Sequence, residues 1–260
     1  MTGSGLRRPE SVSILGCRVD RVDSQGAAAC IDELIERGSS AQVVTLGAEM
    51  ANLAYSDRTY RDIINAADLV VPDTVGIVFA ARLMGTPLPE RVAGVDLLER
   101  VCASASRSQY PVFLLGGAPG VADAAANALT QRHPGLRIAG AEHGYFDDAH
   151  AAEVCERIRA SGARLLFAGL GFPRQERFIY DNRAPLAPCV CIGVGGSFDV
   201  IAGRLPRAPA AIRGAGLEWL YRLAREPRRL RRQLALPVFA MRALRQSLSA
   251  RVGAAQPQVK

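Results

Sequence analysis

The sequence predicts an α/β fold: a Rossmann-like, largely parallel sheet with helices on both faces, plus a C-terminal basic helical appendage. Short apolar runs with the length of strands alternate with segments of helical periodicity through most of the chain. Such alternation favours parallel strands whose connecting helices cover both faces of the sheet. Between residues 203 and 214, proline and glycine interrupt the pattern, and arginines become dense beyond it. We therefore expect an α/β core over residues 1–203 and an arginine-rich appendage over residues 204–260.

The core elements are expected in a regular order. Two short strands surround Gly16 in residues 11–22, and a helix follows from about residue 26 to residue 37. Further runs with the length of buried strands occupy residues 42–47, 67–72, 110–117, 136–142, 164–171 and 190–194. Helices are predicted to begin near Ala48, after Asp73, at Pro119 and at Pro173.

The appendage contains two helical patterns. In the first, Ile212, Ala215, Trp219 and Leu223 share one face, which predicts a single helix through them. In the second, apolar residues recur at helical spacing with arginines among them: Leu230, Leu234, Val238, Met241, Leu244 and Leu248 with Arg231, Arg242 and Arg245. This basic amphipathic segment suits an anionic membrane surface, and packing against the core is the equal alternative. A disordered tail is expected over residues 253–260.

The net charge of +7 is unevenly distributed along the 260 residues. Residues 201–260 contain 13 basic and 2 acidic residues, whereas the first 200 residues contain 19 basic and 23 acidic residues. An acidic body with a basic tail implies a polyanionic partner, namely membrane phospholipid, a diphosphate or nucleic acid. Nucleic acid is disfavoured because no recognisable reading motif and no basic stretch interleaved with aromatic residues is present.

Features of targeting and redox chemistry point to a reduced, cytoplasmic compartment. The N-terminus lacks the apolar segment of a signal peptide, and no uncharged apolar run approaches the ~20 residues that span a bilayer. Cys189 and Cys191 alternate on a predicted strand and so point to one face, where packing is favoured over metal binding. We expect peripheral association with the inner face of the cell membrane. The sequence leaves the oligomeric state open, a homo-oligomer included.

Two polar residues fall at predicted strand ends. Thr45 ends one strand and Asp73 follows the next, and open α/β sheets place ligand-binding groups at such positions. Thr45 also suits an ordinary β-branched strand position. Asp73 is either a carboxylate at the mouth of the sheet or the N-cap of the helix that follows it.

Glycine turns suggest a phosphate site. Gly116 and Gly117 stand between a strand and a helix, an arrangement that offers backbone N–H groups and a positive helix end to phosphate. Gly195 and Gly196 form a turn at the end of the last strand, and the arginines that follow in the chain suit a diphosphate there. The GxGxxG spacing of dinucleotide sites is missing, so a mononucleotide or a sugar nucleotide fits better than NAD. A Rossmann-like oxidoreductase or methyltransferase is the second hypothesis, and binding of NADH or a methyl donor would discriminate it.

Four further residues have two interpretations each. Arg91 and Asp96 either pair with each other around Gly94 or contact a substrate. His143, at a strand end, is either structural or a substrate contact. Gln175 is either a first-turn residue favoured by the helix dipole or a ligand contact.

Ordered sequence blocks give a more specific signal. They are TLGAEM (45–50), ADLVVPDTVGIV (67–78), ERVAGVDLL (90–98), FLLGGAPGVADAAA (113–126), HGYF (143–146), GLGFPRQE (169–176), GVGGSFDVIAG (193–203), RAP (207–209), GLEWLYRL (216–223) and EPRR (226–229). In content and order they resemble the WecG/TagA/CpsF glycosyltransferases, glycosyltransferase family 26. The resemblance covers roughly residues 12–232 and is far more specific than a lone glycine motif.

The resemblance implies an inverting, metal-independent glycosyltransferase without a cofactor. Its donor would be a UDP-sugar, its transferred group a hexose of the N-acetylmannosamine type or related, and its acceptor an undecaprenyl-diphosphate-linked saccharide in surface polysaccharide synthesis. It implies Asp73 as general base and Arg222, Arg229 and Arg232 as the diphosphate-binding arginines. The other substrate contacts it implies are Thr45, Arg91, Asp96, Gly116, Gly117, His143, Tyr145, Gln175, Gly195, Gly196, Phe198, Asp199 and Arg207.

The chain contains no Asp-x-Asp sequence, and the adjacent Asp147 and Asp148 resemble a helix cap. Arginine can stabilise the departing UDP in place of a metal ion. Two positions depart from the family pattern beside the expected base. Gly47 stands where the family has Asn in Thr-x-Asn-x-Glu, and Thr74 stands where it has Gly in Pro-Asp-Gly. These departures bear on the identity of the donor or the acceptor, and on activity.

Overall fold

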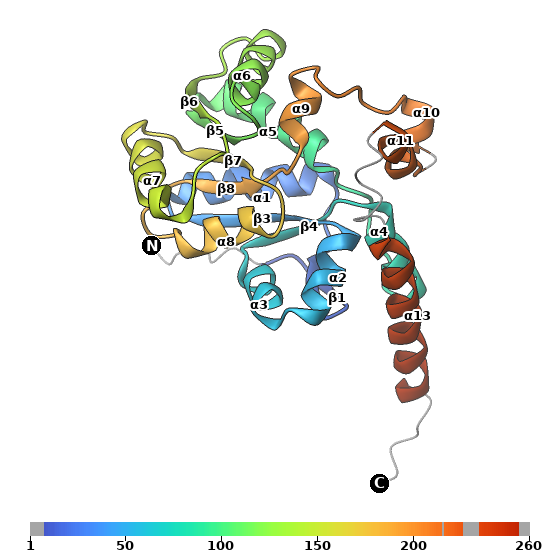
Figure 1. Cartoon of the computed structure of the whole chain (residues 1–260). Helices are drawn as coiled ribbons and strands as arrows, with labels where there is room; N and C mark the ends of the chain where they lie inside the picture. The colour runs from blue at the N-terminus through green and yellow to red at the C-terminus, as the bar shows by residue number, and fades with distance from the viewer. Residues whose placement is uncertain (1–7, 215, 226–233, 255–260) are drawn as a thin grey trace.

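A computed structural model describes residues 8–214, 216–225 and 234–254 (Figure 1). Within them, six parallel strands form one sheet in the order β4-β3-β8-β7-β5-β6. The strands are β3 (Ala41–Leu46), β4 (Leu69–Pro72), β5 (Val112–Gly116), β6 (Ile138–Glu142), β7 (Leu165–Gly169) and β8 (Val190–Gly193). A separate antiparallel hairpin pairs β1 (Ser11–Ile14) with β2 (Cys17–Asp20). The predicted α/β class with a parallel sheet is confirmed.

Helices cover both faces of the sheet, as the alternating pattern predicts. One face is covered by α1 (Ser24–Arg37), α5 (Gly94–Ser108), α6 (Val121–Arg132) and the short α9 (Ser197–Ile201). The opposite face is covered by α2 (Ala48–Ser56), α3 (Arg58–Ala66), α4 (Val75–Leu83), α7 (Ala151–Ala160) and α8 (Arg174–Asp181). Strand residues divide between the two faces by alternation: Val43 packs into the first core cluster and Val44 into the second.

Local sequence signals set several helix ends. The Asp23 carboxylate accepts a hydrogen bond from Gly26 N at the start of α1, and Gly38 ends this helix with φ 68°. Asp57 caps α3 in the same way by accepting from Tyr60 N. Asp147 accepts from His150 N and caps the 3₁₀ turn η1 (Asp148–His150), which confirms the predicted cap.

The two cysteines pack as expected, Cys191 in β8 and Cys189 just before it. Cys189 and Cys191 belong to the same buried cluster as Leu166 and Phe178, on the face covered by α7 and α8. Burial raises the pKa of both thiols, that of Cys189 to about 12, so neither is a thiolate near neutral pH.

The appendage differs from its sequence prediction in one respect. The single helix predicted through Ile212 and Leu223 is wrong, because two short helices, α10 (Ala210–Gly214) and α11 (Glu218–Arg225), stand in its place. Gly216 separates them with φ 73°, a left-handed conformation that interrupts a helix. A Cβ built on Gly216 would lie 3.2 Å from the side chain of Val75, so this turn rests on the start of α4.

The last helix, α13 (Ala235–Ala254), lies against α2 and α4 (Figure 1). Phe239 and Ala243 are buried in the core cluster that these helices share. Met241, Leu244 and Leu248 are each about half exposed, at 48%, 49% and 53%. Packing against the core, one of the two interpretations of the amphipathic segment, is therefore confirmed for one face of α13, and the membrane interpretation of its exposed apolar stripe stays a prediction. Leu230 and Arg231 lie outside the described residues, as does most of the predicted disordered tail.

None of the described helices combines the length and the apolar character that a membrane span requires.

Candidate active site

The carboxyl ends of the six parallel strands meet at one edge of the sheet, and the predicted site residues follow this edge. Thr45, near the end of β3, is buried, and its hydroxyl donates a hydrogen bond to Gly193 O at 2.7 Å. This bond ties the ends of two neighbouring strands, β3 and β8, together. Thr45 thus has a structural bond in addition to its place at the sheet edge.

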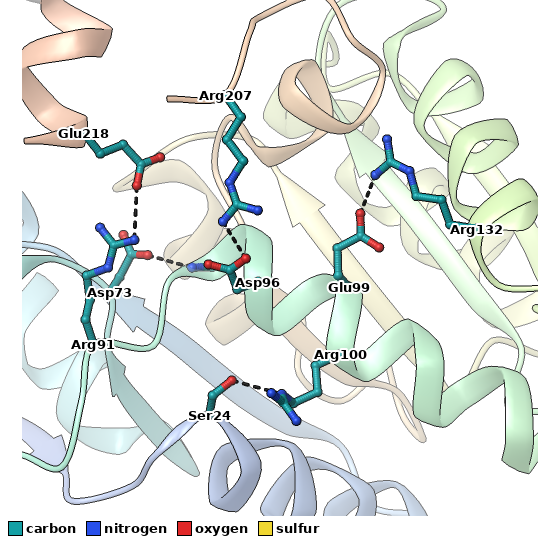
Figure 2. A network of polar contacts seen from close by, with 10 residues as sticks. Ser24, Asp73, Arg91, Asp96, Glu99, Arg100, Arg132, Arg207 and Glu218 are labelled. Atoms are coloured by element: carbon teal, nitrogen blue, oxygen red, sulfur yellow. Dashed lines mark hydrogen bonds and ion pairs between the residues drawn. The ribbon is translucent and has the colours of Figure 1, made fainter. Parts of the chain in front are cut away.

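Asp73 directly follows β4 and points toward the start of α5. Its Oδ1 accepts a hydrogen bond from Gly94 N at 2.7 Å (Figure 2). Gly94 is the first residue of α5, where backbone N–H groups lack intrahelical partners and favour a carboxylate. The N-cap of α4 is Thr74, so the interpretation of Asp73 as the cap of its own following helix is wrong.

Thr45, Asp73 and Gly94 form one corner of the site. A Cβ built on Gly94 would lie 3.6 Å from Thr45 Oγ1 and 3.7 Å from Asp73 Oδ1. These are ordinary van der Waals distances, so the start of α5 packs directly against both side chains. Asp73 is half-buried at this edge of the sheet.

Arg91 and Asp96 each pair with the appendage. Arg91 Nη2 lies 3.1 Å from Glu218 Oε2 at the start of α11, and Asp96 Oδ1 accepts from Arg207 Nη2 at 2.5 Å (Figure 2). The interpretation in which Arg91 and Asp96 pair with each other is therefore wrong, because each has a more distant partner in the appendage, and contact with a substrate stays a prediction. Figure 2 places both ion pairs next to Asp73, so they hold the appendage beside the corner described above.

A second feature lies farther along the same edge, where β8, β7, β5 and β6 end. It is an open pocket of about 940 Å³. Five of its lining residues were predicted from sequence: Gly117, Tyr145, Gly195, Gly196 and Asp199. The other lining residues are Ala118, Gly144, Phe146, Asp147, His150, Glu153, Arg157, Gly169, Leu170, Gly171 and Arg174.

Gly116 and Gly117 are required by close backbone packing. Gly116 has φ 148°, and a Cβ there would lie 2.5 Å from the backbone of Gly169. Gly117 has φ 70° and donates its N–H to Gly169 O at 3.2 Å. Only Gly117 lines the pocket, whereas Gly116 allows β5 and β7 to approach where they end.

Gln175 lies beneath the glycine turn after β8. Its Oε1 accepts from Gly195 N at 3.0 Å, and its Nε2 donates to Glu176 Oε1 at 2.7 Å. Tyr60 donates its hydroxyl to the other oxygen of Glu176 at 2.9 Å. Burial raises the pKa of the Glu176 carboxyl, and the two hydrogen bonds oppose this shift. In this structure the Gln175 amide positions the Gly195 turn, where the sequence prediction was a sugar or nucleotide contact.

Phe198 and His143 were also predicted as substrate contacts, but neither lines the pocket. Phe198 is 1% exposed and packs into the main core cluster, where its ring would meet a Cβ built on Gly169 at 2.9 Å. Phe198 therefore packs against Gly169, which lines the pocket. His143 is exposed, and its Nδ1 accepts from Tyr145 N at 3.3 Å, so it shapes the loop that carries Tyr145.

The pocket contains charged residues that the sequence analysis did not select. Arg174 precedes Gln175 within the block GLGFPRQE, and this block is the sequence signal that could have identified Arg174 as a site residue. Arg157, Glu153 and His150 come from α7 and the turn before it, where no motif marks them. His150 lies 2.5 Å from Asp147, and this contact raises the pKa of His150 and lowers that of Asp147.

The remaining predicted arginines are outside the described side chains. Arg222 belongs to α11, but its side chain is not described, and Arg229 and Arg232 lie outside the described residues. In the part of the chain that the structure describes, no three or more His, Cys, Asp or Glu side chains gather as a metal site would require.

The fold and the sheet-edge site define an α/β enzyme of the Rossmann-like class, with a helix-anchored carboxylate and a glycine-lined pocket along one edge. Comparison with known proteins identifies the family. The model of the glycosyl transferase WecG/TagA/CpsF family matches residues 12–253, and the chain belongs to this family. It is a glycosyltransferase.

Curated relatives agree with this assignment. A protein of Bacillus spizizenii is 35% identical over 211 residues, which cover 81% of each chain, and one of Bacillus subtilis is 33% identical over 212 residues, 82% of each. A protein of Staphylococcus aureus is 36% identical over 197 residues, 76% of this chain and 77% of its own. All three are named N-acetylglucosaminyldiphosphoundecaprenol N-acetyl-beta-D-mannosaminyltransferase.

Proposed function

We propose that this chain is an inverting glycosyltransferase that moves a hexose of the N-acetylmannosamine type from a UDP-sugar to an undecaprenyl-diphosphate-linked acceptor. The names of the relatives support a lipid-linked acceptor and a mannosamine-type sugar. The observation that carries the proposal is the Asp73 carboxylate, which is half-buried at the end of β4 and oriented by Gly94 N. The reaction requires a carboxylate held in a fixed orientation, and Asp73 lies on the same edge of the sheet as the proposed donor pocket.

In the proposed reaction Asp73 is the general base. It takes the proton of the acceptor hydroxyl while that oxygen attacks the anomeric carbon of the donor. The bond between the anomeric carbon and the UDP oxygen breaks on the opposite side, so the configuration inverts. UDP leaves with its electron pair, and cationic groups stabilise the charge that develops on it.

The pocket at the ends of β5, β6, β7 and β8 is the proposed donor site. Its glycine turns at Gly117 and Gly195 allow a ligand to approach the backbone. Tyr145, which is 72% exposed at the rim, offers an aromatic face to a base. Asp73 and the pocket lie on the same edge of the sheet, because all six strands are parallel.

The appendage is the proposed source of the arginines that stabilise the departing diphosphate. Ion pairs from Arg91 to Glu218 and from Asp96 to Arg207 join it to the start of α5, next to Asp73. This arrangement supports a role for the arginines of the basic segment, with Arg222, Arg229 and Arg232 as the proposed ligands of the diphosphates. Arginine suits that role because its paired donors match phosphate oxygens.

The exposed stripe of α13 supports peripheral attachment to the inner face of the cell membrane. Met241, Leu244 and Leu248 form an apolar face about half exposed to solvent, and Arg245 is exposed beside it. A helix with this pattern can lie in the interface of an anionic bilayer with its apolar face buried. Such attachment would bring the site to a lipid-linked acceptor.

The test is a screen of UDP-sugars with a short-chain lipid-diphosphate N-acetylglucosamine acceptor, with product detected by mass spectrometry. Transfer from UDP-N-acetylmannosamine is expected, including in excess EDTA. Transfer of a different hexose would correct the donor, and rescue by magnesium after EDTA would contradict metal independence. No transfer from any UDP-sugar to this acceptor would overturn the proposal.

A further inference from the structure

The proposed donor pocket contains two arginines whose charges differ in their compensation. Arg157 makes a bidentate ion pair with Glu142, with Nε and Nη2 at 2.8 and 2.9 Å from the two carboxylate oxygens. That carboxylate neutralises its charge, and the same contact raises the pKa of Arg157. Among the described residues, no acidic side chain lies within ion-pair distance of Arg174.

Arg174 is held instead by neutral groups. Its Nη1 donates to Gly144 O at 2.6 Å, and its Nη2 donates to Phe146 O. The guanidinium carbon also lies 4.5 Å from the centre of the Phe146 ring. A guanidinium carries five N–H groups, so these two bonds leave donors that can face the pocket. Carbonyl oxygens and a ring fix the orientation of the group without removing its positive charge.

The remaining charged groups of the pocket leave Arg174 as the favoured contact for a phosphate. Asp147 is paired with His150, and Glu153 lies close enough to His150 and Arg157 to act on the pKa of both. The wall formed by η1 and α7 therefore offers no net positive charge to a phosphate. Asp199 lines the pocket from α9 and repels a phosphate. The favoured place for a phosphate group is consequently beside Arg174.

We infer that Arg174 contacts the diphosphate of the donor and, through its bonds to Gly144 and Phe146, couples that contact to the loop that carries Tyr145. This inference rests on the proposed function, since it assumes that the pocket receives a UDP-sugar. Arg174 would then place its positive charge at the phosphates. Its bonds to the carbonyl oxygens of Gly144 and Phe146 would hold the loop at the rim of the pocket.

The test compares Arg174→Met and Arg159→Met for binding of UDP, UMP and uridine by isothermal titration calorimetry. Hydrogen bonds to a charged group are among the stronger ones in proteins, so Arg174→Met is expected to weaken UDP binding on the order of tenfold to a hundredfold. Uridine, which has no phosphate, is expected to change by less than about threefold. Arg159→Met is the matched control, because Arg159 is exposed on α7, pairs with Glu156 and does not line the pocket, so UDP binding is expected to stay within about threefold of wild type.

Arg174→Lys separates charge from geometry. It keeps the positive charge but cannot hold both carbonyl oxygens in the same way, so UDP binding is expected between those of wild type and Arg174→Met. If Arg174→Met does not fold, as judged by thermal unfolding, a loss in Arg174→Lys that is larger for UDP than for uridine supports the inference.

Equal weakening of uridine, UMP and UDP in a folded variant would mean that Arg174 only holds the loop, and the inference would be wrong. Unchanged UDP binding in a folded Arg174 variant would also show that the inference is wrong. If wild type binds no UDP at all, the assignment of the pocket to the donor fails together with the inference. Binding by wild type with no specific loss in the variants overturns the inference alone.

Discussion

Gly47 and Thr74 lie against each other across the ends of β3 and β4: a Cβ built on Gly47 would stand 3.4 Å from Thr74 Cγ2. These are the two positions at which the chain departs from its family pattern. Gly47 is the N-cap of α2 and has no side chain to cap it. Thr74 Oγ1 accepts from Ala48 N, the first N–H of α2, at 3.1 Å. Thr74 thus supplies the kind of polar contact that an Asn at position 47 would otherwise offer.

We predict that the two departures are energetically coupled. Thr74→Gly should lower the free energy of unfolding by about 1 kcal/mol, the usual effect of losing a cap. Adding Gly47→Asn should recover most of this loss, since Asn is a preferred N-cap and the loss of the threonine side chain leaves it space. Urea unfolding of the two single variants and the double variant measures the coupling. Strictly additive effects would mean that the two positions act independently.

Asp73→Asn should preserve the fold and reduce turnover by on the order of a hundredfold or more, as loss of a general base commonly does. The Asn carbonyl can still accept from Gly94 N, so the start of α5 should keep its position. Steady-state transfer assays and thermal unfolding of the same preparation check both parts. A folded variant with near-normal turnover would remove Asp73 from the role of base.

Glu218→Gln should loosen the appendage. The Glu218 and Arg91 side chains are only 10% and 21% exposed, so the change leaves a largely buried guanidinium without its counter-charge. Faster amide hydrogen exchange is expected over residues 210–225, with little change in β3 or β4. Glu156→Gln is the matched control, because its pair with Arg159 is exposed on α7. Equal amide exchange in wild type, Glu218→Gln and Glu156→Gln would show that the Arg91–Glu218 ion pair does not hold this segment.

Replacement of Met241, Leu244 and Leu248 by Ser should reduce binding to anionic liposomes without unfolding the protein, because these side chains are about half exposed. Phe239→Ser is the contrasting variant. Phe239 is 4% exposed and packed against α2 and α4, so its loss should cost several kcal/mol of stability. Sedimentation with vesicles and thermal unfolding provide the two readouts. If the triple variant binds vesicles as wild type does, the membrane assignment of α13 is incorrect.

His150 should titrate above its ordinary pKa of about 6.5, since the hydrogen bond and the charge of Asp147 favour the imidazolium. With a raised folded-state pKa, its stabilising contribution is present at low pH and is lost as pH rises through that pKa. The lowered pKa of Asp147 has the opposite sense, so its contribution is lost as pH falls through it. NMR titration of the three histidines would show this, and Asp147→Asn should return only His150 toward its ordinary value. No downward shift in Asp147→Asn would contradict the pairing.

The boundary expected between residues 203 and 204 remains a prediction, but the packing of α13 changes what truncation would do. Phe239 and Ala243 belong to a core cluster with residues of α2 and α4. Removal of residues 204–260 would expose that cluster to solvent. The amphipathic pattern could not reveal this, because the same spacing serves a helix that lies on a membrane or on a protein core.

The sequence by itself determined the class of fold, the strands and the residues at their ends. Apolar runs and turn glycines act over a few neighbouring residues, so local patterns alone could assign Thr45, Asp73 and Gly117 to one edge of a parallel sheet. The ordered motifs determined the family in the same way. Only the tertiary structure decided which side chains meet. Arg91 pairs with Glu218, 127 residues later, and Asp73 contacts the start of α5 and does not cap α4. These partners depend on the strand order and on the docking of separate helices, and no local pattern contains that information.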